Sequence, residues 1–299
     1  MPELPDVELY RHALGARIQG HTLRRIRLAS PFLVRSVSPR PDEAVGREIV
    51  ALRRLGKRIV WAFSGDLFFV IHLMIAGRFQ WKPAGEKIPG RLGLAAFDFD
   101  HGTVLLTEAG SKRRASLYVV QGEAALAEHD PGGLEPLDID LAAFDLQLHS
   151  ENHTLKRALT DPHLFAGIGN AYSDEILHAA KLSPLQLTSR LGAEQTKTVY
   201  DATRRVLIDW RDRLIAETGD AFPSKVTAFR EGMAAHGRFG RPCPVCGTAI
   251  QRIRYEANEA NYCPTCQTGG RLLADRSLSR LLREDWPKTV EEMEMRKRR

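Results

Sequence analysis

The sequence predicts an α+β protein of several domains, in which an N-terminal helix and an antiparallel β-sandwich or barrel precede a helical region and a zinc ribbon. Three observations support this prediction. Short apolar runs separated by tight turns fill the first part of the chain, which is typical of antiparallel sheets. Helical periodicity replaces them in the second part. Two Cys-x-x-Cys pairs then follow.

The first elements are a short helix and a series of strands. From Pro5 to about Ile18, apolar residues recur at helical spacing, and Gly20 follows as a stop signal. Beyond it, β-rich runs are separated by the turns Ser64–Asp66 and Asp100–Gly102. The predicted strands are Ile59–Phe63, Leu67–Leu73, Leu92–Phe99, Val104–Thr107 and Leu117–Val120.

A change of composition marks the connection to the helical part. The stretch Asp130–Gly133 and the nearby Pro136 are typical of an interdomain connection. After the cysteines, leucines from Leu272 to Leu282 predict an amphipathic helix that ends before Pro287, followed by a frayed basic terminus. The other predicted helices are Leu141–Leu148, Leu155–Leu159, Ser173–Ala180 and Ala193–Thr218.

The composition is that of a chain that buries its own core. Its 299 residues are 43% hydrophobic and 27% charged, which excludes general disorder. No apolar run approaches the roughly 18 residues that cross a bilayer. Glu3, Asp6 and Glu8 stand where a signal peptide would be basic, so we expect an intracellular, cytoplasmic protein in a reducing compartment.

The net charge of +6 and a pI of about 9.2 permit nucleic-acid binding but do not establish it. The basic residues are clustered, and each cluster taken alone is typical of a solvated face. The clusters are Arg24, Arg25 and Arg27; Arg53, Arg54, Lys57 and Arg58; Lys112 to Arg114; and Arg296 to Arg299.

The four cysteines predict one structural zinc ion. Cys243 and Cys246 form one pair, Cys263 and Cys266 the other, and 16 residues separate the pairs, as in a four-thiolate zinc ribbon. Four thiolates close the coordination sphere, so the metal leaves no position for a catalytic water. The alternative, a pair of disulfides, needs an oxidising compartment for which the chain shows no export signal.

The N-terminus offers a candidate nucleophile. Removal of Met1 leaves Pro2 with a free secondary amine, and an α-amino group has a pKa of roughly 7.7 to 8, so part of it is neutral at physiological pH. Attack of this amine on a sugar C1′ gives an iminium ion, as in lysine Schiff-base chemistry. Glu3 is suited to proton transfer at the sugar ring. Alternatively, Pro2 only shapes the chain terminus.

Five motifs occur together in order and resemble those of the Fpg/Nei family of DNA glycosylases. They are P-E-L-P-D-V-E at the start, Lys57 in L-G-K-R-I, H-L-M-I-A-G at His72–Gly77, G-I-G-N-A-Y-S-D-E at Gly167–Glu175, and C-P-V-C with Y-C-P-T-C in the ribbon. The resemblance covers the chain up to Cys266 and implies a β-sandwich domain, a helix-two-turn-helix domain and a zinc ribbon, with DNA in the cleft between.

The resemblance also implies domain boundaries and a function. We expect an N-terminal catalytic β-sandwich domain (1–130), a linker (131–148), a helix-two-turn-helix DNA-binding domain (149–235), the ribbon (236–267) and a helical, basic extension (268–299). The implied activity is base excision of oxidised or ring-opened bases through an imine with Pro2, followed by β,δ-elimination at the abasic site. The implied partner is damaged DNA, bound by a monomer associated with the nucleoid.

Matching positions imply roles for individual residues. Pro2 is the nucleophile and Glu3 the acid, while Lys57 contacts the phosphate beside the lesion. Gly167 and Gly169 let backbone N–H groups approach a phosphate at a helix start. The implied DNA contacts are made by Lys57, His72, Ile75, Arg113, Lys156, Asn170 and Arg254. Lys57 could otherwise be an ordinary exposed charge, and Asn170 a helix cap.

Turning a base out of the duplex leaves a gap that the family fills with a Met, an Arg and a Phe. Here Ile75 stands at the Met position, Arg113 at the Arg position and Ala115 at the Phe position. An apolar wedge remains physically suitable, and Ile75 provides one.

Two further departures from the family lie near the ribbon. Asn258 replaces a phosphate-binding Arg, with Arg252 and Arg254 on the same hairpin. The segment 220–236 is shorter than in typical Fpg enzymes, which implies an open, Nei-like pocket for oxidised pyrimidines, ring-opened purines or bulkier damage.

Two other functions remain open from the sequence. The first is a catalytically weak protein of the same fold that binds lesions or abasic sites, which Asn258 and the altered wedge would explain. The second is a zinc-ribbon DNA-binding regulator, which the N-terminal motif disfavours. In each case the clusters at Lys57 and Arg58, Arg113 and Arg114, Lys156, and Arg252 and Arg254 predict DNA binding that weakens steeply with salt.

Overall fold

The computed structural model describes residues 1–110, 112–224, 226–227, 229–255, 258–274 and 287–297. The chain forms two compact units. The first contains Met1–Gly132 and Asp209–Ala228, and the second contains Gly133–Ile208 and Phe229–Arg299. The first junction falls inside the predicted linker, whereas the return of Asp209–Ala228 to the first unit is a long-range association that the predicted boundaries do not include.

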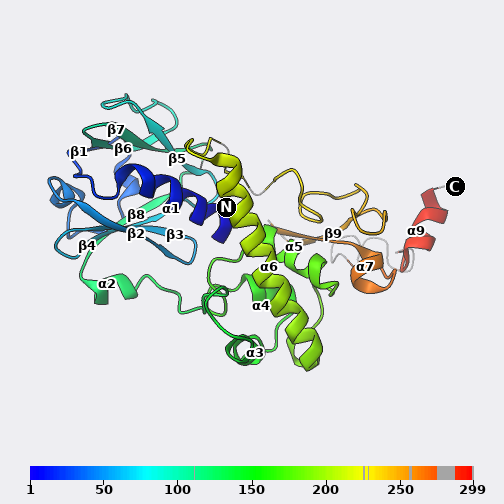
Figure 1. Cartoon of the computed structure of the whole chain (residues 1–299). Coiled ribbons are helices and arrows are strands. Elements are labelled where there is room, and N and C mark those ends of the chain that lie inside the picture. Colours follow the sequence, from blue (N-terminus) through cyan, green and yellow to red (C-terminus); the bar gives the residue numbers. More distant parts are fainter. Residues whose placement is uncertain (111, 225, 228, 256–257, 275–286, 298–299) are drawn as a thin grey trace. The chain divides into compact units, whose positions relative to one another are not determined.

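The first unit holds two antiparallel four-stranded sheets, which Figure 1 shows as two layers with the helix α1 (Leu4–Ile18) beside them. One sheet has the order β1–β6–β7–β5, made of Arg25–Leu28, Gly93–Phe99, Gly102–Glu108 and Gly77–Lys82. The other has the order β2–β3–β4–β8, made of Ile49–Leu55, Arg58–Phe63, Leu67–His72 and Ser116–Gln121. The unit also contains the short helix α2 (Glu123–Ala127) and the 3₁₀ helices η1 (Pro31–Leu33) and η2 (Pro41–Ala44).

Aromatic side chains fill the core between the sheets. Trp61 of β3 meets Phe97 of β6 edge to face, with ring centroids 4.9 Å apart, and Phe69 of β4 joins them. On the other face of the second sheet, Val60 and Phe68 pack with Leu126 of α2. Both faces of β3 and β4 are therefore covered, which is why these strands are continuous apolar runs rather than alternating ones.

The helix α1 is attached to the first unit along its length. Its Tyr10 packs edge to face on Phe79 of β5, and also contacts Phe222 in the returning segment. At its last turn, Arg17 donates to the carbonyl of Asp220 and lies over the Phe222 ring. These contacts hold the beginning of the chain in place.

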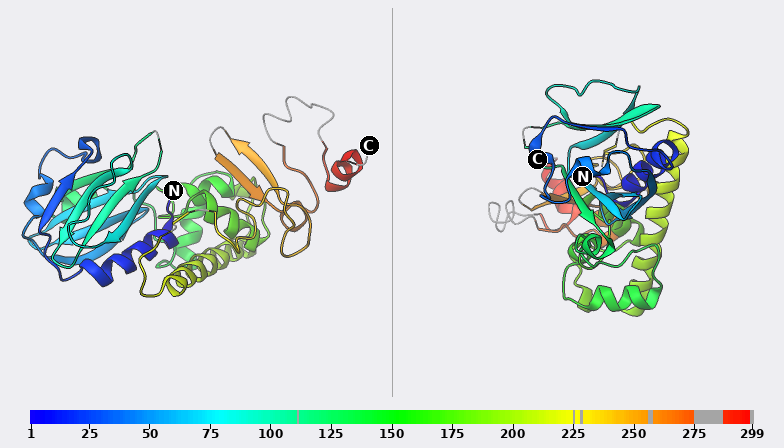
Figure 2. Two further views of the ribbon diagram at one scale, coloured as in Figure 1. Left: turned by 90° about the horizontal axis from the view of Figure 1, so that it is seen from above. Right: turned by 90° about the vertical axis from the view of Figure 1, so that its left-hand side faces the viewer.

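The second unit is helical and carries a two-stranded hairpin. Its helices are α3 (Leu141–His149), α4 (Leu155–Thr160), α5 (Asn170–Ala180), η3 (Thr188–Arg190), α7 (Pro264–Thr268) and α9 (Val290–Lys297). The long helix α6 (Ala193–Thr218) contributes residues to both units. The strands β9 (Gln251–Tyr255) and β10 (Asn258–Tyr262) pair antiparallel and appear as the orange hairpin in Figure 2.

Most predicted elements are present within a few residues of their predicted ends, and further elements are present that were not predicted, among them β1, β2, β5 and α2. The strand β2 carries Arg53 and Arg54, which obscured its apolar alternation. The predicted helix at Leu272–Leu282 lies largely outside the described residues, and the terminus expected to fray contains α9. Among the described residues, none of the helices has both the length and the apolar character needed to cross a membrane.

Candidate functional site

The start of the chain is buried and tightly held. Pro2 is buried and the Glu3 side chain is only 3% exposed. The Asp6 carboxylate accepts the backbone N–H of Glu3 at 3.0 Å, which completes a capping box at the start of α1. The Asp6 carboxylate therefore fixes the backbone of Glu3, the residue that follows the predicted nucleophile Pro2.

The electrostatic surroundings favour a neutral amine at the N-terminus. Burial is the largest cause that lowers the pKa of the Met1 amine from its usual value near 8. Glu3 and Asp6 oppose this shift, whereas Arg78 and Lys57 add to it, and the net direction is downward. A lower pKa leaves a larger neutral, nucleophilic fraction at physiological pH.

Lys57 lies in the tight turn between β2 and β3, where Gly56 has a positive φ of 57°. An ion pair connects this turn to α1, because Arg54 Nε lies 2.7 Å from Glu8 Oε1 and Arg54 also donates to the Gly56 carbonyl. Burial alone would raise the pKa of Glu8, but the bonds from Arg11 and Arg54 lower it, so the pair stays charged. The turn with Lys57 is thereby positioned relative to the chain start.

His72 lines a basic cavity of about 430 Å³ at the end of β4. Three arginines share the lining, namely Arg35, Arg58 and Arg114. The Nε2 atom of His72 is buried and has no hydrogen-bond partner in the described part of the chain. Burial and then the charges of Arg58 and Lys57 lower the pKa of His72 to about 4. The cavity therefore offers an anion a set of cations without a neighbouring carboxylate in its lining.

The depressed pKa of His72 predicts an acid-sensitive first unit. In the unfolded chain His72 titrates near 6.5, whereas in the fold it stays neutral down to about pH 4. Protons therefore bind the unfolded state preferentially below pH 6.5, and stability falls by up to about 3 kcal/mol as the pH drops from 6.5 to 4. In guanidinium unfolding across this range, His72→Gln should lose less stability than the wild type, by about this amount. An equal loss in both proteins would contradict the assignment.

Ile75 is the exposed residue of the H-L-M-I-A-G turn, with 60% of its surface accessible. Met74 before it adopts a left-handed backbone, with φ of 52°, and Arg78 holds the turn by donating to the Ile75 carbonyl at 3.1 Å. An exposed apolar side chain on a braced turn has the character required of a wedge.

Arg113 is exposed, whereas Ala115, the residue before β8, is only 3% exposed. The carboxylate of Glu108 accepts the backbone N–H groups of Arg114 and Ala115 at 3.0 and 3.1 Å, which anchors this loop to the end of β7. Ala115 is therefore a core residue here, and it has neither the size nor the exposure to fill a gap in DNA.

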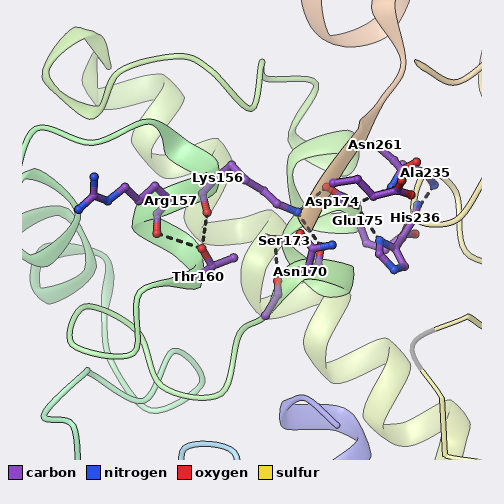
Figure 3. Close-up of polar contacts among 12 residues, drawn as sticks. Lys156, Arg157, Thr160, Asn170, Ser173, Asp174, Glu175, Ala235, His236 and Asn261 are labelled. Carbon is purple, nitrogen blue, oxygen red and sulfur yellow. Dashed lines mark hydrogen bonds and ion pairs between the residues drawn. The ribbon is translucent and has the colours of Figure 1, made fainter. Parts of the chain in front are cut away.

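In the second unit, Lys156 and Asn170 lie together (Figure 3). Lys156 Nζ donates to the Asn170 carbonyl at 2.6 Å and forms an ion pair with Asp174 at 2.5 Å. Asn170 is the first residue of α5, and the N-cap is Gly169, so Asn170 does not cap this helix through its side chain. Gly167 precedes α5 and has a positive φ of 80°, so the chain turns sharply just before the helix begins. The backbone N–H groups at such a helix start are suited to bind a phosphate.

Arg254 is exposed on β9 of the ribbon hairpin, paired in register with Glu259. Its neighbour Arg252 lies over the ring of Phe239, 4.2 Å from the centroid, and near Glu259. The side chain of Asn258 lies outside the described part of the structure.

The four cysteine sulfurs gather within 4.8 Å of one another. The Sγ atoms of Cys243 and Cys266 are 4.0 Å apart, and those of Cys246 and Cys263 are 3.4 Å apart. Tetrahedral zinc with Zn–S bonds of about 2.3 Å places sulfurs roughly 3.8 Å apart, so the arrangement fits one structural zinc ion. His178 of α5 supports the site, with Nε2 3.2 Å from Cys243 Sγ, as donors to metal ligands commonly do.

The structure groups the sequence-derived candidates by unit. In the first unit, the N-terminal amine is close enough to interact electrostatically with Glu3, Lys57 and His72, and Lys57 also acts on His72. In the second, Lys156 and Asn170 are in contact. Sequence reasoning missed Asp174, His236 and Asn261, which form a buried hydrogen-bonded cluster. Only the S-D-E end of the G-I-G-N motif could have indicated it.

Comparison with known proteins identifies similar sequences for each part. Residues 1–114 match the formamidopyrimidine-DNA glycosylase N-terminal domain, residues 133–209 the H2TH domain of the same enzymes, and residues 240–269 the zinc finger found in FPG and IleRS. The formamidopyrimidine-DNA glycosylase of Heliobacterium modesticaldum is 33% identical over 281 residues, which are 89% of this chain and all of the relative.

Other relatives and solved structures agree. An uncharacterized formamidopyrimidine-DNA glycosylase-like protein of Mycobacterium tuberculosis is 40% identical over 155 residues, covering 51% of this chain and 96% of the relative. The MutM (Fpg) protein of Thermus thermophilus superposes with a TM-score of 0.74 at 30% identity, covering 89% of this chain and 98% of its own. Lactococcus lactis Fpg bound to DNA with an abasic site shares the fold, with a TM-score of 0.77 at 23% identity, 89% coverage of this chain and 99% of that one.

Proposed function

Because the chain belongs to the formamidopyrimidine-DNA glycosylase family, we propose that its Pro2 amine is the nucleophile and Glu3 the proton donor of base excision. The chain is a base-excision repair DNA glycosylase, and lyase activity at abasic sites is typical of the family. The proposal assigns the steps of this activity to residues.

The chemistry begins with the neutral Pro2 amine. Its lone pair forms a bond to C1′ of the damaged nucleotide while the glycosidic bond breaks. The base leaves with the electron pair of the glycosidic bond and takes up the proton that the Pro2 nitrogen loses. Loss of the amine proton and opening of the sugar ring, to which Glu3 donates a proton, leave an iminium ion at C1′. Removal of a C2′ proton then expels the 3′-phosphate, and a second elimination releases the 5′-phosphate.

The observation that carries this assignment is the surroundings of the N-terminal amine. Burial and the cations Arg78 and Lys57 lower the pKa of the Met1 amine, and the buried Pro2 and Glu3 follow Met1 in the chain. The Pro2 amine of the processed chain begins one residue deeper in these surroundings. Intact-mass spectrometry should therefore show a protein that lacks Met1, because a retained Met1 turns the Pro2 nitrogen into an amide.

We further propose that the substrate is duplex DNA with an oxidised or ring-opened base. Ile75 is the apolar wedge, and Lys57, His72 and Arg113 in the first unit contact DNA, as do Lys156, Asn170 and Arg254 in the second. The exposure of Ile75 and of Arg113 supports their assignment as residues that contact DNA. A panel of duplexes with one lesion each, from 8-oxoguanine to ring-opened purines and oxidised pyrimidines, tests the choice of base. Excision of none of them would contradict the assignment.

The buried Ala115 favours one alternative, a protein that binds lesions or abasic sites but turns over poorly. The two functions differ in whether the protein forms an imine. Borohydride reduction in the presence of abasic-site DNA traps the enzyme as a covalent adduct. Binding without a trapped adduct would support the alternative.

The proton-donor assignment predicts a large effect of Glu3→Gln. Glutamine keeps the size of the side chain but supplies no carboxylic proton, so base excision should fall by about 10²- to 10⁴-fold. Nicking at preformed abasic sites should survive in part, because there the base is already gone. The matched control is Glu128→Gln, an exposed glutamate of the same unit, which should excise normally. Undiminished excision by Glu3→Gln would disprove the role.

A further inference from the structure

The basic cavity at the end of β4 holds more positive charge than the proposed DNA contacts use. It has a volume of about 430 Å³, and its lining includes Arg35, Arg58 and Arg114 together with His72 and Tyr118. This volume is within the usual range for ligand sites. All of these residues belong to the first unit. Among them, the proposed DNA contacts include only His72, so the three arginines have no assigned role.

Strand register brings the lining residues together. In the sheet β2–β3–β4–β8, Arg58 of β3 lies opposite His72 of β4, which in turn lies opposite Ser116 of β8. Residues that are directly opposite in antiparallel strands place their side chains on the same face. Arg35 is added by the chain alongside β8, where its backbone N–H donates to the Leu117 carbonyl at 2.9 Å. The cavity is therefore built on regular pairing at the end of a sheet.

The arginines of this cavity have unused binding capacity. Within the described ranges, the guanidinium groups of Arg35, Arg58 and Arg114 form no ion pair and no hydrogen bond, whereas the two arginines of β2 each pair with a glutamate. Arg58 is half-buried, and burial lowers its pKa although Tyr118 and Asp130 act in the opposite direction. A partly desolvated cation without an ion-pair partner is unfavourable, and an anion in the cavity would offset that cost.

The amount of charge favours one kind of anion. Three guanidinium groups carry three positive charges at every physiological pH. His72 is neutral there, but its buried Nε2 has no partner in the described part of the chain and can carry the single hydrogen of the ring. An internal phosphodiester of DNA brings one negative charge. A terminal phosphate monoester brings about −1.5 to −2 and three strong acceptor oxygens, which arginine forks bind in pairs.

We propose that this cavity binds the terminal phosphate monoester of a cleaved DNA strand through Arg35, Arg58 and Arg114, so that the protein retains the end of the break it makes. The inference rests on the proposed function for the origin of this ligand. Each elimination breaks a C–O bond of the abasic sugar, and the electron pair leaves with the phosphate oxygen. The first elimination leaves a 5′-phosphate on one fragment, and the second leaves a 3′-phosphate on the other.

The first test measures equilibrium binding of the zinc-loaded wild-type chain to four duplexes with a one-nucleotide gap. The ends at the gap carry both phosphates, the 5′-phosphate alone, the 3′-phosphate alone, or hydroxyl groups only. No base or sugar is left at the gap, so binding does not require the Pro2 amine. A phosphate end should raise the affinity about tenfold, and the two single-phosphate duplexes identify which end is bound. Equal affinity for all four duplexes would overturn the proposal.

The second test separates the cavity from general attraction between the basic protein and an extra phosphate. Arg35 and Arg40 are exposed arginines in the same connection between β1 and β2, but Arg40 lies outside the cavity lining and pairs with Asp42. Arg35→Gln and Arg40→Gln therefore change the net charge equally. Arg35→Gln should lose most of the preference for phosphate ends, and Arg40→Gln should keep it. The same preference in both variants would refute a contact by Arg35.

The third test uses Arg58→Lys, which keeps the positive charge but removes the planar fork. Its preference for phosphate ends should fall several-fold, while its affinity for the hydroxyl-ended gap should stay within about twofold of the wild type. An equal loss of affinity for both duplexes would show that Arg58 supports the fold and not the ligand. Borohydride trapping on abasic-site DNA is scored separately. A missing adduct with an intact end preference would disprove the proposed catalysis alone, and a normal adduct without end preference would disprove this inference alone.

Discussion

Replacing Pro2 with glycine should reduce the borohydride-trapped adduct on abasic-site DNA to below about 1% of the wild-type amount, equivalent to roughly 2.7 kcal/mol in the barrier. The proline nitrogen is a secondary amine, so its condensation product is an iminium ion that carries its positive charge at every pH. A glycine amine is primary, and its imine becomes an electron sink only after protonation. Glycine also lacks the proline ring, which is buried two residues before α1.

A matched substitution separates this chemistry from helix stability. Pro5 is also a buried proline, at the second position of α1, and Pro5→Ala should keep the adduct. DNA affinity and zinc content should be unchanged in both variants. An adduct of normal yield in Pro2→Gly would place the nucleophile elsewhere, with lysines such as Lys57 the next residues to test.

A second form of the experiment removes the amine without changing Pro2. An added residue that is not removed can be placed before Pro2. It converts the Pro2 nitrogen into an amide, which has no basic lone pair. This protein should form no adduct at all, although it folds and binds a duplex that carries one tetrahydrofuran abasic-site analogue. Strand cleavage of normal rate by this protein would contradict an imine at the N-terminus.

Loss of the zinc ion should have the second largest effect. Structural zinc contributes about 10–16 kcal/mol of apparent binding energy in zinc-finger peptides at pH 7, and this energy is also folding energy. Chelation should therefore unfold the segment 240–269 and with it the hairpin that carries Arg254. DNA binding should weaken strongly, and exchange of the β9–β10 amide hydrogens should become fast.

The contacts of the ribbon explain why its loss reaches further into the second unit. Gln267 accepts the Cys263 N–H and donates to the Leu182 carbonyl, and Asn261 bonds to Asp174. Unfolding of the ribbon removes Asn261 as a partner of the buried Asp174. The side chains of Lys156 and His236, which bond to Asp174, should then be less precisely oriented.

Two substitutions in one turn isolate the effect of the metal. Cys246 and Val245 are adjacent and exposed, and only the cysteine is a ligand. Cys246→Ser should lose zinc and DNA affinity, while Val245→Ser should retain one zinc per chain by atomic emission. Normal zinc content in Cys246→Ser would contradict a four-thiolate site.

The local signals in the sequence proved informative wherever an element carries its own pattern. The helix α6 begins and ends at the predicted residues, and the predicted strands from Ile59 to Val120 lie within a residue or two of β3, β4, β6, β7 and β8. In contrast, β2 was missed because Arg53 and Arg54 interrupt its apolar pattern. Those arginines pair with Glu123 and Glu8, which are distant in sequence.

The charge clusters also have partners that are distant in sequence and could not be predicted from local patterns. Arg24 and Arg27 are grouped with Arg25 in the sequence, but they pair with Asp100 and Asp98 across the sheet. A formal charge counts these arginines toward DNA binding, whereas the fold engages them in ion pairs. The cavity at Arg35, Arg58 and Arg114, by comparison, has cations without a carboxylate in its lining, and it is assembled from strands and loops that are distant in sequence.

The sequence by itself determined the family, the zinc ligands and the candidate nucleophile, because each depends on residue types at short fixed spacing: Pro2 beside Glu3, G-I-G-N before a helix, and two Cys-x-x-Cys pairs. Only the tertiary structure decided that Ala115 is buried, that Asn170 does not cap α5, and that Asp174 joins Lys156, His236 and Asn261. His236 and Asn261 lie 62 and 87 residues from Asp174. Their meeting depends on burial of a shared carboxylate, which has no signature in local sequence.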